Sequence, residues 1–227
     1  MEIQKWYKNS IFLARDADWV FLLKNCKTKE EMLKAFDNYL SIFECTKITD
    51  LLLNIYAQSS FIPNDKFTFM GNKKLVYENY KSDPYYPVIE PLHRAHYEYN
   101  IDFVDIFINK MNSIGIRPWL TLRMNDSHYL AEGVGLMQSD EYHKALSSGK
   151  IFGEKYGYFK ANPDFSNGEY TDALLGYIEE FLNKYDIYGL DLDFLREIYC
   201  FNYKDNPNCH KIMTEFIRKI KTNKFRC

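Results

Sequence analysis

Residues 171–196, TDALLGYIEEFLNKYDIYGLDLDFLR, hold the clearest structural pattern in this chain of 227 residues. Apolar side chains recur at helical spacing from 171 to 185, and a turn at Tyr188-Gly189 then opens the run LDLDFLR, in which leucine alternates with aspartate. A period near 3.6 residues is typical of an amphipathic helix, and a period of two is typical of a strand. The stretch therefore predicts a helix followed at once by a β-strand.

The same unit recurs twice upstream, and one further helix is predicted downstream. Thr28 with Glu31 three positions later is a capping-box pattern at the start of one helix, and Gly115 ends another. The predicted helices cover 28–44, 102–113 and 211–221, and the predicted strands cover 51–58 and 116–126. Because helices that alternate with short buried strands are typical of a parallel sheet, we expect an α/β fold, namely a partial (β/α) barrel of the TIM type with long βα loops.

Two long segments interrupt these units. Residues 59–100 and 127–167 are rich in polar, aromatic, proline or glycine residues, and they predict loops, with a short helix near 141–146 in the second. A closed barrel needs eight strands, and only three are recognisable here. We therefore expect a single domain, 1–227, that forms the N-terminal part of a truncated or split barrel. Its exposed sheet edge would favour self-association.

The composition narrows the class of protein. With 46% hydrophobic and 26% charged residues, the chain has enough apolar side chains for one sizeable core. A formal net charge of −2 argues against nucleic acid as a partner. No stretch is apolar enough for a signal peptide or a membrane span, so we expect a cytoplasmic protein that does not bind membranes.

The cysteines predict neither disulfides nor a metal site. Five cysteines, without a C-x-x-C pair, are an odd number that fits a reducing compartment. Cys200, Cys209 and His210 match no standard zinc spacing. We expect no metal site.

Polar residues gather on one face of each predicted strand, toward its carboxyl end. Residues two apart share a face, and the shared polar positions are Asn54 and Tyr56, then Arg123 and Asn125, then Asp191 and Asp193, with Asp126 and His128 just beyond the second strand. In parallel barrels the active site lies at the carboxyl ends of the strands. The sequence thus predicts Asp191 and Asp193 as catalytic residues and the other six as substrate-binding residues.

The charges of this group allow a structural and a functional interpretation. Arg123 is expected to pair with Asp191 or Asp193, because a buried charge needs a partner. The second carboxyl group would then be costly to ionise beside the first, which favours a raised pKa suited to acid or base chemistry. Trp119, early in its strand, is interpreted as a core residue, although its ring could line a sugar subsite.

These segments resemble a known family. The runs WLTLRMNDSH (119–128), NPDFSNGEYTDALLGYIEEFLNKYDIYGLDLDFLRE (162–197) and MTEFIRKIK (213–221), with a weaker echo in TDLLLNIYAQ (49–58), are similar to the family-10-like glycosyl hydrolases. The resemblance implies a (β/α) barrel that hydrolyses O-glycosidic bonds of an oligo- or polysaccharide. It implies no obligatory cofactor.

A second likeness limits the mechanism. YGLDLDFL is similar to the D-G-x-D-x-D-x-E motif of glycoside hydrolase family 18, but Tyr188 and Leu195 stand where that motif has its first aspartate and its catalytic acid. The mechanism of that family is therefore not supported, unless Glu197 or a residue elsewhere supplies the acid. The alternative from another class is a non-catalytic carbohydrate-binding or scaffold protein with an open α/β sheet.

Overall fold

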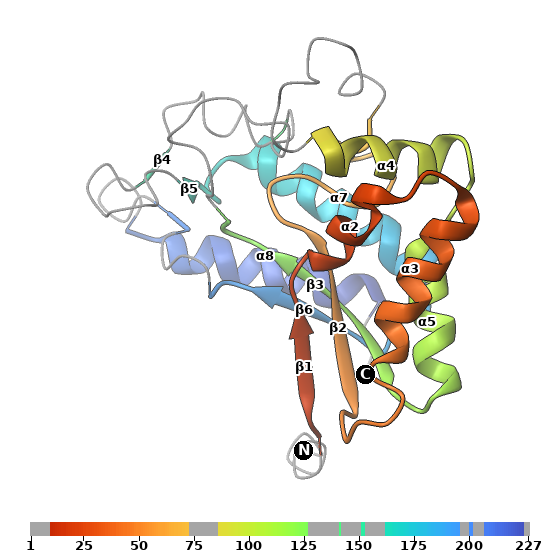
Figure 1. The fold of residues 1–227 in the computed structure, drawn as a ribbon. Helices are drawn as coiled ribbons and strands as arrows, with labels where there is room; N and C mark the ends of the chain where they lie inside the picture. Colours follow the sequence, from red (N-terminus) through yellow and green to blue (C-terminus); the bar gives the residue numbers. More distant parts are fainter. Residues whose placement is uncertain are drawn as a thin grey trace.

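A four-stranded parallel sheet forms the centre of the molecule. The computed structural model describes residues 10–72, 86–126, 141, 151–152, 162–195, 200–201 and 207–224. The sheet strands lie in the order β1 (Phe12–Arg15), β2 (Asp50–Tyr56), β3 (Arg117–Arg123) and β6 (Gly189–Asp193), as Figure 1 shows. The predicted α/β fold with parallel strands and flanking helices is confirmed. Neighbours in sequence are neighbours in the sheet, an order compatible with part of a β/α barrel.

Helices connect the strands of the sheet. Between β1 and β2 lie α2 (Asp18–Leu22), η2 (Leu23–Asn25) and α3 (Lys29–Ser41), and between β2 and β3 lie α4 (Tyr86–Tyr97) and α5 (Phe103–Ser113). Helix α7 (Gly168–Lys184) precedes β6, and α8 (Cys209–Lys224) follows it. A short antiparallel pair, β4 (Ile151–Phe152) with β5 (Asn162–Pro163), stands apart from the sheet. No helix in the described ranges is long and apolar enough to cross a membrane.

The sequence signals for the start of one helix and the end of another are present in the structure. The Thr28 side chain accepts a hydrogen bond from the backbone N–H of Glu31, and the Glu31 carboxylate accepts one from the N–H of Thr28, which confirms the predicted capping box. Gly115 adopts a φ of 76°, a left-handed conformation that glycine tolerates at a helix end. This conformation turns the chain from α5 directly into β3.

One face of the sheet forms the hydrophobic core with the helices. Side chains from β2, β3, α3, α5, α7 and α8 belong to a single cluster, which includes Leu51, Leu53, Ile55, Leu120, Leu122, Phe36, Phe107, Ile178, Phe181 and Phe216. Burial of a large apolar side chain contributes about 1.5–3 kcal/mol, so this shared cluster is the main source of stability. We call this side of the sheet the helix-covered face.

The opposite face carries side chains in rows across the strands. From the amino ends to the carboxyl ends, the register sets Phe12 beside Asp50 and Arg117, then Ala14 beside Leu52, Trp119 and Gly189, then Asn54 beside Thr121 and Asp191, and finally Arg123 beside Asp193. The last two rows are polar. They lie where all four strands end, because the strands are parallel.

Trp119 belongs to the second of these rows and not to the core, so its interpretation as a core residue was wrong. Its indole N–H donates to the Asp50 carboxylate over 2.8 Å, and Arg117 donates to the other oxygen over 2.5 Å. A side chain at Gly189 would place its Cβ 2.1 Å from the indole ring. Gly189 is the first residue of β6, and glycine is needed there because the ring occupies the space of a side chain.

Six elements of the described structure, β1, α2, η2, α4, β4 and β5, were not predicted from the sequence. Strand β1 is only four residues long, and helix α4 lies inside the segment 59–100 that was expected to be a loop. Pro91 sits in the interior of α4, where proline removes one helical hydrogen bond. The apolar residues Val88, Ile89 and Leu92 compensate by burial. Of the short helix expected at 141–146, only Glu141 lies within the described residues, and it is helical.

Candidate functional site

The candidate site lies on the opposite face, where the parallel strands end. We call it the strand-end site, and it consists of Asp16, Gln58, Thr121, Arg123, Asn125, Asp126, Asp191 and Asp193. Asp191 and Asp193 share this face in β6, as the alternation of residues predicted, and their register neighbours in β3 are Thr121 and Arg123. Residues at the ends of β1 and β2 join the site through Arg123 and Asp126.

Asp191 is a half-buried carboxyl group held by a hydroxyl. The Thr121 hydroxyl donates to its Oδ2 over 2.6 Å. Burial raises the pKa of Asp191 above the ordinary range, the hydrogen bond from Thr121 opposes this shift, and the negative charge of Asp193 adds to it. A raised pKa increases the fraction of Asp191 that carries a proton, which suits a general acid.

Asp193 is held by the backbone that follows its strand. Its Oδ1 accepts a hydrogen bond from the N–H of Leu195 over 2.8 Å. The Leu195 side chain is 94% exposed, so the chain leaves the sheet at this point toward solvent. This bond orients the Asp193 carboxylate at the end of β6.

Arg123 pairs with two acids other than those expected. Its guanidinium lies 2.7 Å from the Asp16 carboxylate and 3.3 Å from that of Asp126. The predicted ion pair with Asp191 or Asp193 was wrong, because the end of β1 and the turn after β3 each bring an acid closer. Among the described residues, neither Asp191 nor Asp193 forms an ion pair with a cation.

Asn125 and Asp126 hold three strand ends together. Asn125 is fully buried and donates to the Phe194 carbonyl over 3.4 Å and to the Cys200 sulfur over 3.8 Å. Asp126 is 3% exposed and accepts from the Gln58 amide over 3.4 Å as well as from Arg123. Both residues lie at the carboxyl end of β3, and their burial indicates that they position the strand ends, while their predicted role in substrate binding stays a prediction.

Cys200 is a buried thiol beside Asn125. Burial raises its pKa to about 12, against the opposing effect of the hydrogen bond from Asn125. The nucleophilic form of cysteine is the thiolate, which is scarce at such a pKa.

Asn54 and Tyr56 do not share a face, contrary to the prediction. The register between β2 and β3 shifts after Asn54, so that Tyr56 lies beside Leu122 on the helix-covered face. There the Tyr56 hydroxyl lies 3.0 Å from that of Tyr170 in α7, and Tyr56 is fully buried. The register shift is a β-bulge. The Asn54 side-chain oxygen accepts a hydrogen bond from the N–H of Tyr56 over 3.0 Å, which stabilises the bulge. Asn54 lies in the row of Asp191, whereas Tyr56 is a core residue.

Two acidic residues, Asp16 and Asp164, were not predicted as site residues from the sequence. Asp16 directly follows the strand FLAR, an apolar-to-charged transition that indicates a strand end. Asp164 is 2% exposed, accepts from the N–H of Ser166, and lies next to Phe165, whose N–H donates to the Cys200 carbonyl. His128 lies outside the described residues, as does Glu197. Within the described ranges, no group of three histidine, cysteine or acidic residues could hold a metal ion.

The chain matches no protein-family model, and no curated protein matches it.

Proposed function

We propose that the protein is a barrel-type glycoside hydrolase, akin to the family-10-like glycosyl hydrolases, that acts on O-glycosidic bonds of an oligo- or polysaccharide at the strand-end site. One observation carries the proposal: two carboxyl groups, Asp191 and Asp193, share one strand face without a cationic partner in the described structure. The parallel strands in sequential order support it, because such folds place their chemistry at the carboxyl ends.

The proposed chemistry uses the difference between the two carboxyl groups. Hydrolysis of a glycoside needs one acid that protonates the leaving oxygen and one carboxylate near the sugar carbon that becomes positively charged. Asp191, whose pKa burial raises, is the proposed acid. Asp193, whose carboxylate is oriented by the Leu195 N–H, supplies the negative charge that stabilises the oxocarbenium-like transition state.

The distance along the strand fits this division of roles. Two residues of a strand rise by about 6.6 Å. Paired carboxyl groups of glycosidases lie about 5–9.5 Å apart, and the rise between the two positions falls within this range. Arg123 forms its ion pairs with Asp16 and Asp126. It therefore does not hold Asp191 in the ionised form, and Asp191 can still donate a proton.

The test is an assay of chromogenic glycosides and of soluble polysaccharides, with binding measured in parallel by calorimetry. Turnover that Asp193→Asn abolishes supports the proposal, and the exposed helix residue Asp172 provides the matched control in Asp172→Asn. Hydrolysis left unaltered by Asp193→Asn would remove the proposed role. Saturable glycan binding without turnover would instead favour the non-catalytic carbohydrate-binding protein.

A further inference from the structure

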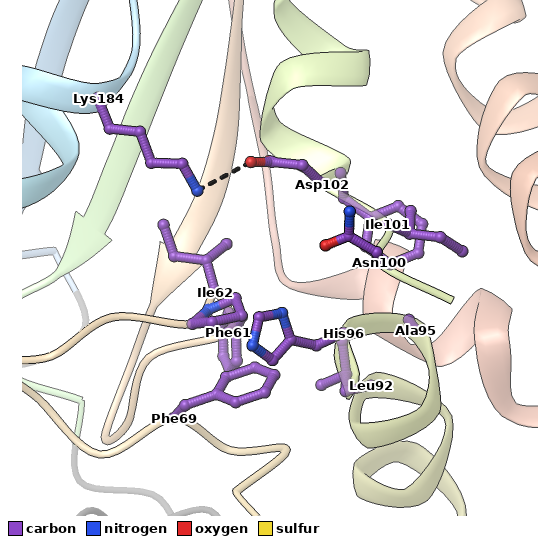
Figure 2. A pocket seen from close by; sticks show the side chains of 12 residues that line it. Phe61, Ile62, Phe69, Leu92, Ala95, His96, Asn100, Ile101, Asp102 and Lys184 are labelled. Carbon is purple, nitrogen blue, oxygen red and sulfur yellow. Dashed lines mark ion pairs between the residues drawn. The ribbon is translucent and has the colours of Figure 1, made fainter. Parts of the chain in front are cut away.

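A second cavity lies among the helices, away from the strand-end site. The segment after β2, the second half of α4 and the turn between α4 and α5 enclose it, with Lys184 of α7 on one side (Figure 2). An inner recess of about 80 Å³ adjoins an outer groove of about 610 Å³, and both are lined by Pro63, Phe69, His96 and Lys184. We call the two together the side groove. No residue of the strand-end site lines it.

The inner part of the side groove is apolar. Phe61, Ile62, Phe69 and Leu92 are each at most 5% exposed and form its floor. The Phe69 and His96 rings meet edge to face at 5.7 Å, which fixes the imidazole against this floor. The outer groove is within the size of small-molecule sites, about 300–1,000 Å³, and such sites combine an apolar lining with a few polar groups.

His96 is the first of these polar groups. It is half-buried, and its ring nitrogens have no hydrogen-bond partner among the described residues. Burial lowers its pKa, Lys184 and His93 act in the same direction, and Asp102 opposes them. A neutral imidazole offers one donor and one acceptor. His96 therefore presents both to the groove near neutral pH.

Asn100 is the second polar group. It has a φ of 50°, a left-handed conformation that few residues other than glycine adopt. In Figure 2 its amide lies between His96 and Asp102, on the side of the cavity that faces Lys184. The amide has no hydrogen-bond partner within the described residues. It supplies a second donor and a second acceptor.

Three of the charged groups around the side groove, Lys184, Asp102 and Glu180, have partners in the protein, whereas the exposed side chains of Asp65 and Lys66 at the outer groove form no ion pair among the described residues. The Lys184 ammonium lies 2.9 Å from the Asp102 carboxylate, which also accepts from the Tyr185 hydroxyl at 3.0 Å. Glu180 accepts from the backbone N–H of Asp65 at 3.0 Å. An ionic ligand would disturb these pairs, whereas a neutral ligand with hydroxyl groups would use the donors and acceptors that remain.

We propose that the side groove binds a neutral, polyhydroxylated ligand the size of one sugar unit. Its hydroxyl groups donate to and accept from His96 and Asn100, and its less polar face lies against Phe69. This site does not depend on the reaction proposed for the strand-end site, because the two share no residue.

The test measures by NMR the binding of three probes that share one sugar ring: neutral glucose, anionic glucuronate and cationic glucosamine. Glucose should bind saturably and at least as tightly as either charged probe. His96→Phe keeps the ring packing and removes the hydrogen bonds, and Asn100→Gly removes the amide while glycine accepts the positive φ. Each should weaken glucose binding about threefold to tenfold. Thermal melts confirm that both variants fold.

A second arm separates the two sites. Asp193→Asn should leave glucose binding in the side groove unchanged. Three results would overturn the proposal: no saturable binding of glucose, glucose binding that His96→Phe and Asn100→Gly leave intact, or glucuronate that binds more tightly than glucose and is lost in Lys184→Met. The last result would identify an anion site.

Discussion

Arg123 at the end of β3 forms an ion pair of 2.7 Å with Asp16, which follows β1, although β2 lies between these strands in the sheet. Asp126 approaches the same guanidinium at 3.3 Å. The cation of the strand-end site is therefore neutralised by acids that follow β1 and β3. Asp191 and Asp193, in β6, have no cationic partner among the described residues, and this division underlies the proposed chemistry.

The two partners of Arg123 should contribute unequally to stability. The Asp16 side chain is 39% exposed, and that of Asp126 is 3% exposed. Asp16→Asn should cost about 0.5–1 kcal/mol, as an exposed ion pair does. Asp126→Asn should cost about 2–3 kcal/mol, because it leaves buried donors without their charged acceptor. Urea unfolding of both variants measures this difference, and an equal cost would contradict the described geometry.

Asp191→Asn should change how stability depends on pH. The pKa of Asp191 is raised in the folded protein, so the folded state holds its proton more tightly than the unfolded state does. Ionisation of Asp191 therefore lowers stability as the pH rises from about 4 through the folded pKa. Asparagine removes this cost and can still accept from Thr121.

The measurement is thermal melting of wild type and Asp191→Asn from pH 3 to pH 8. The variant should gain melting temperature relative to wild type as the pH rises, and the two should converge at the acid end. The opposite result is a melting temperature of the variant that falls relative to wild type from pH 3 to pH 7. It would show that the fold stabilises the Asp191 carboxylate.

Gly189→Ala should destabilise the protein by about 1–3 kcal/mol, the usual cost of overpacking. Its Cβ would lie 2.1 Å from the Trp119 ring. The same change in a Trp119→Ala background should cost much less, because the ring is gone. Gly168→Ala is the control, since a Cβ there meets nothing within 4 Å. An equal cost of Gly189→Ala in both backgrounds would place the cause in the backbone instead.

Much of the fold follows from local sequence patterns, and the failures have physical reasons. The capping box at Thr28 and the glycine at 115 mark helix ends through interactions within a few residues. Helix α4 was missed because Pro91 has a poor helix propensity, which only tertiary burial of its neighbours offsets. Strand β1 was missed because four residues, two of them exposed, carry little periodicity.

The candidate site was predictable to the extent that strands alternate regularly. Asp191 and Asp193 share a face as the period of two requires. Tyr56 does not share the face of Asn54, because a bulge breaks the period, and no sequence signal marks that bulge. The partner of Arg123 depends on which strand ends meet in space. Asp16, about a hundred residues away in sequence, could be assigned only from the sheet order.

The most direct test of the central claim is the dependence of kcat/KM on pH for hydrolysis of a chromogenic glycoside by wild type and Asp191→Asn. If protonated Asp191 is the general acid, wild-type activity falls at high pH as the proton is lost. The variant then has at least about 100-fold lower kcat/KM and lacks that alkaline limb. A variant that keeps both the rate and the alkaline limb of wild type would show that another group supplies the proton and would contradict the proposed role of the strand-end site.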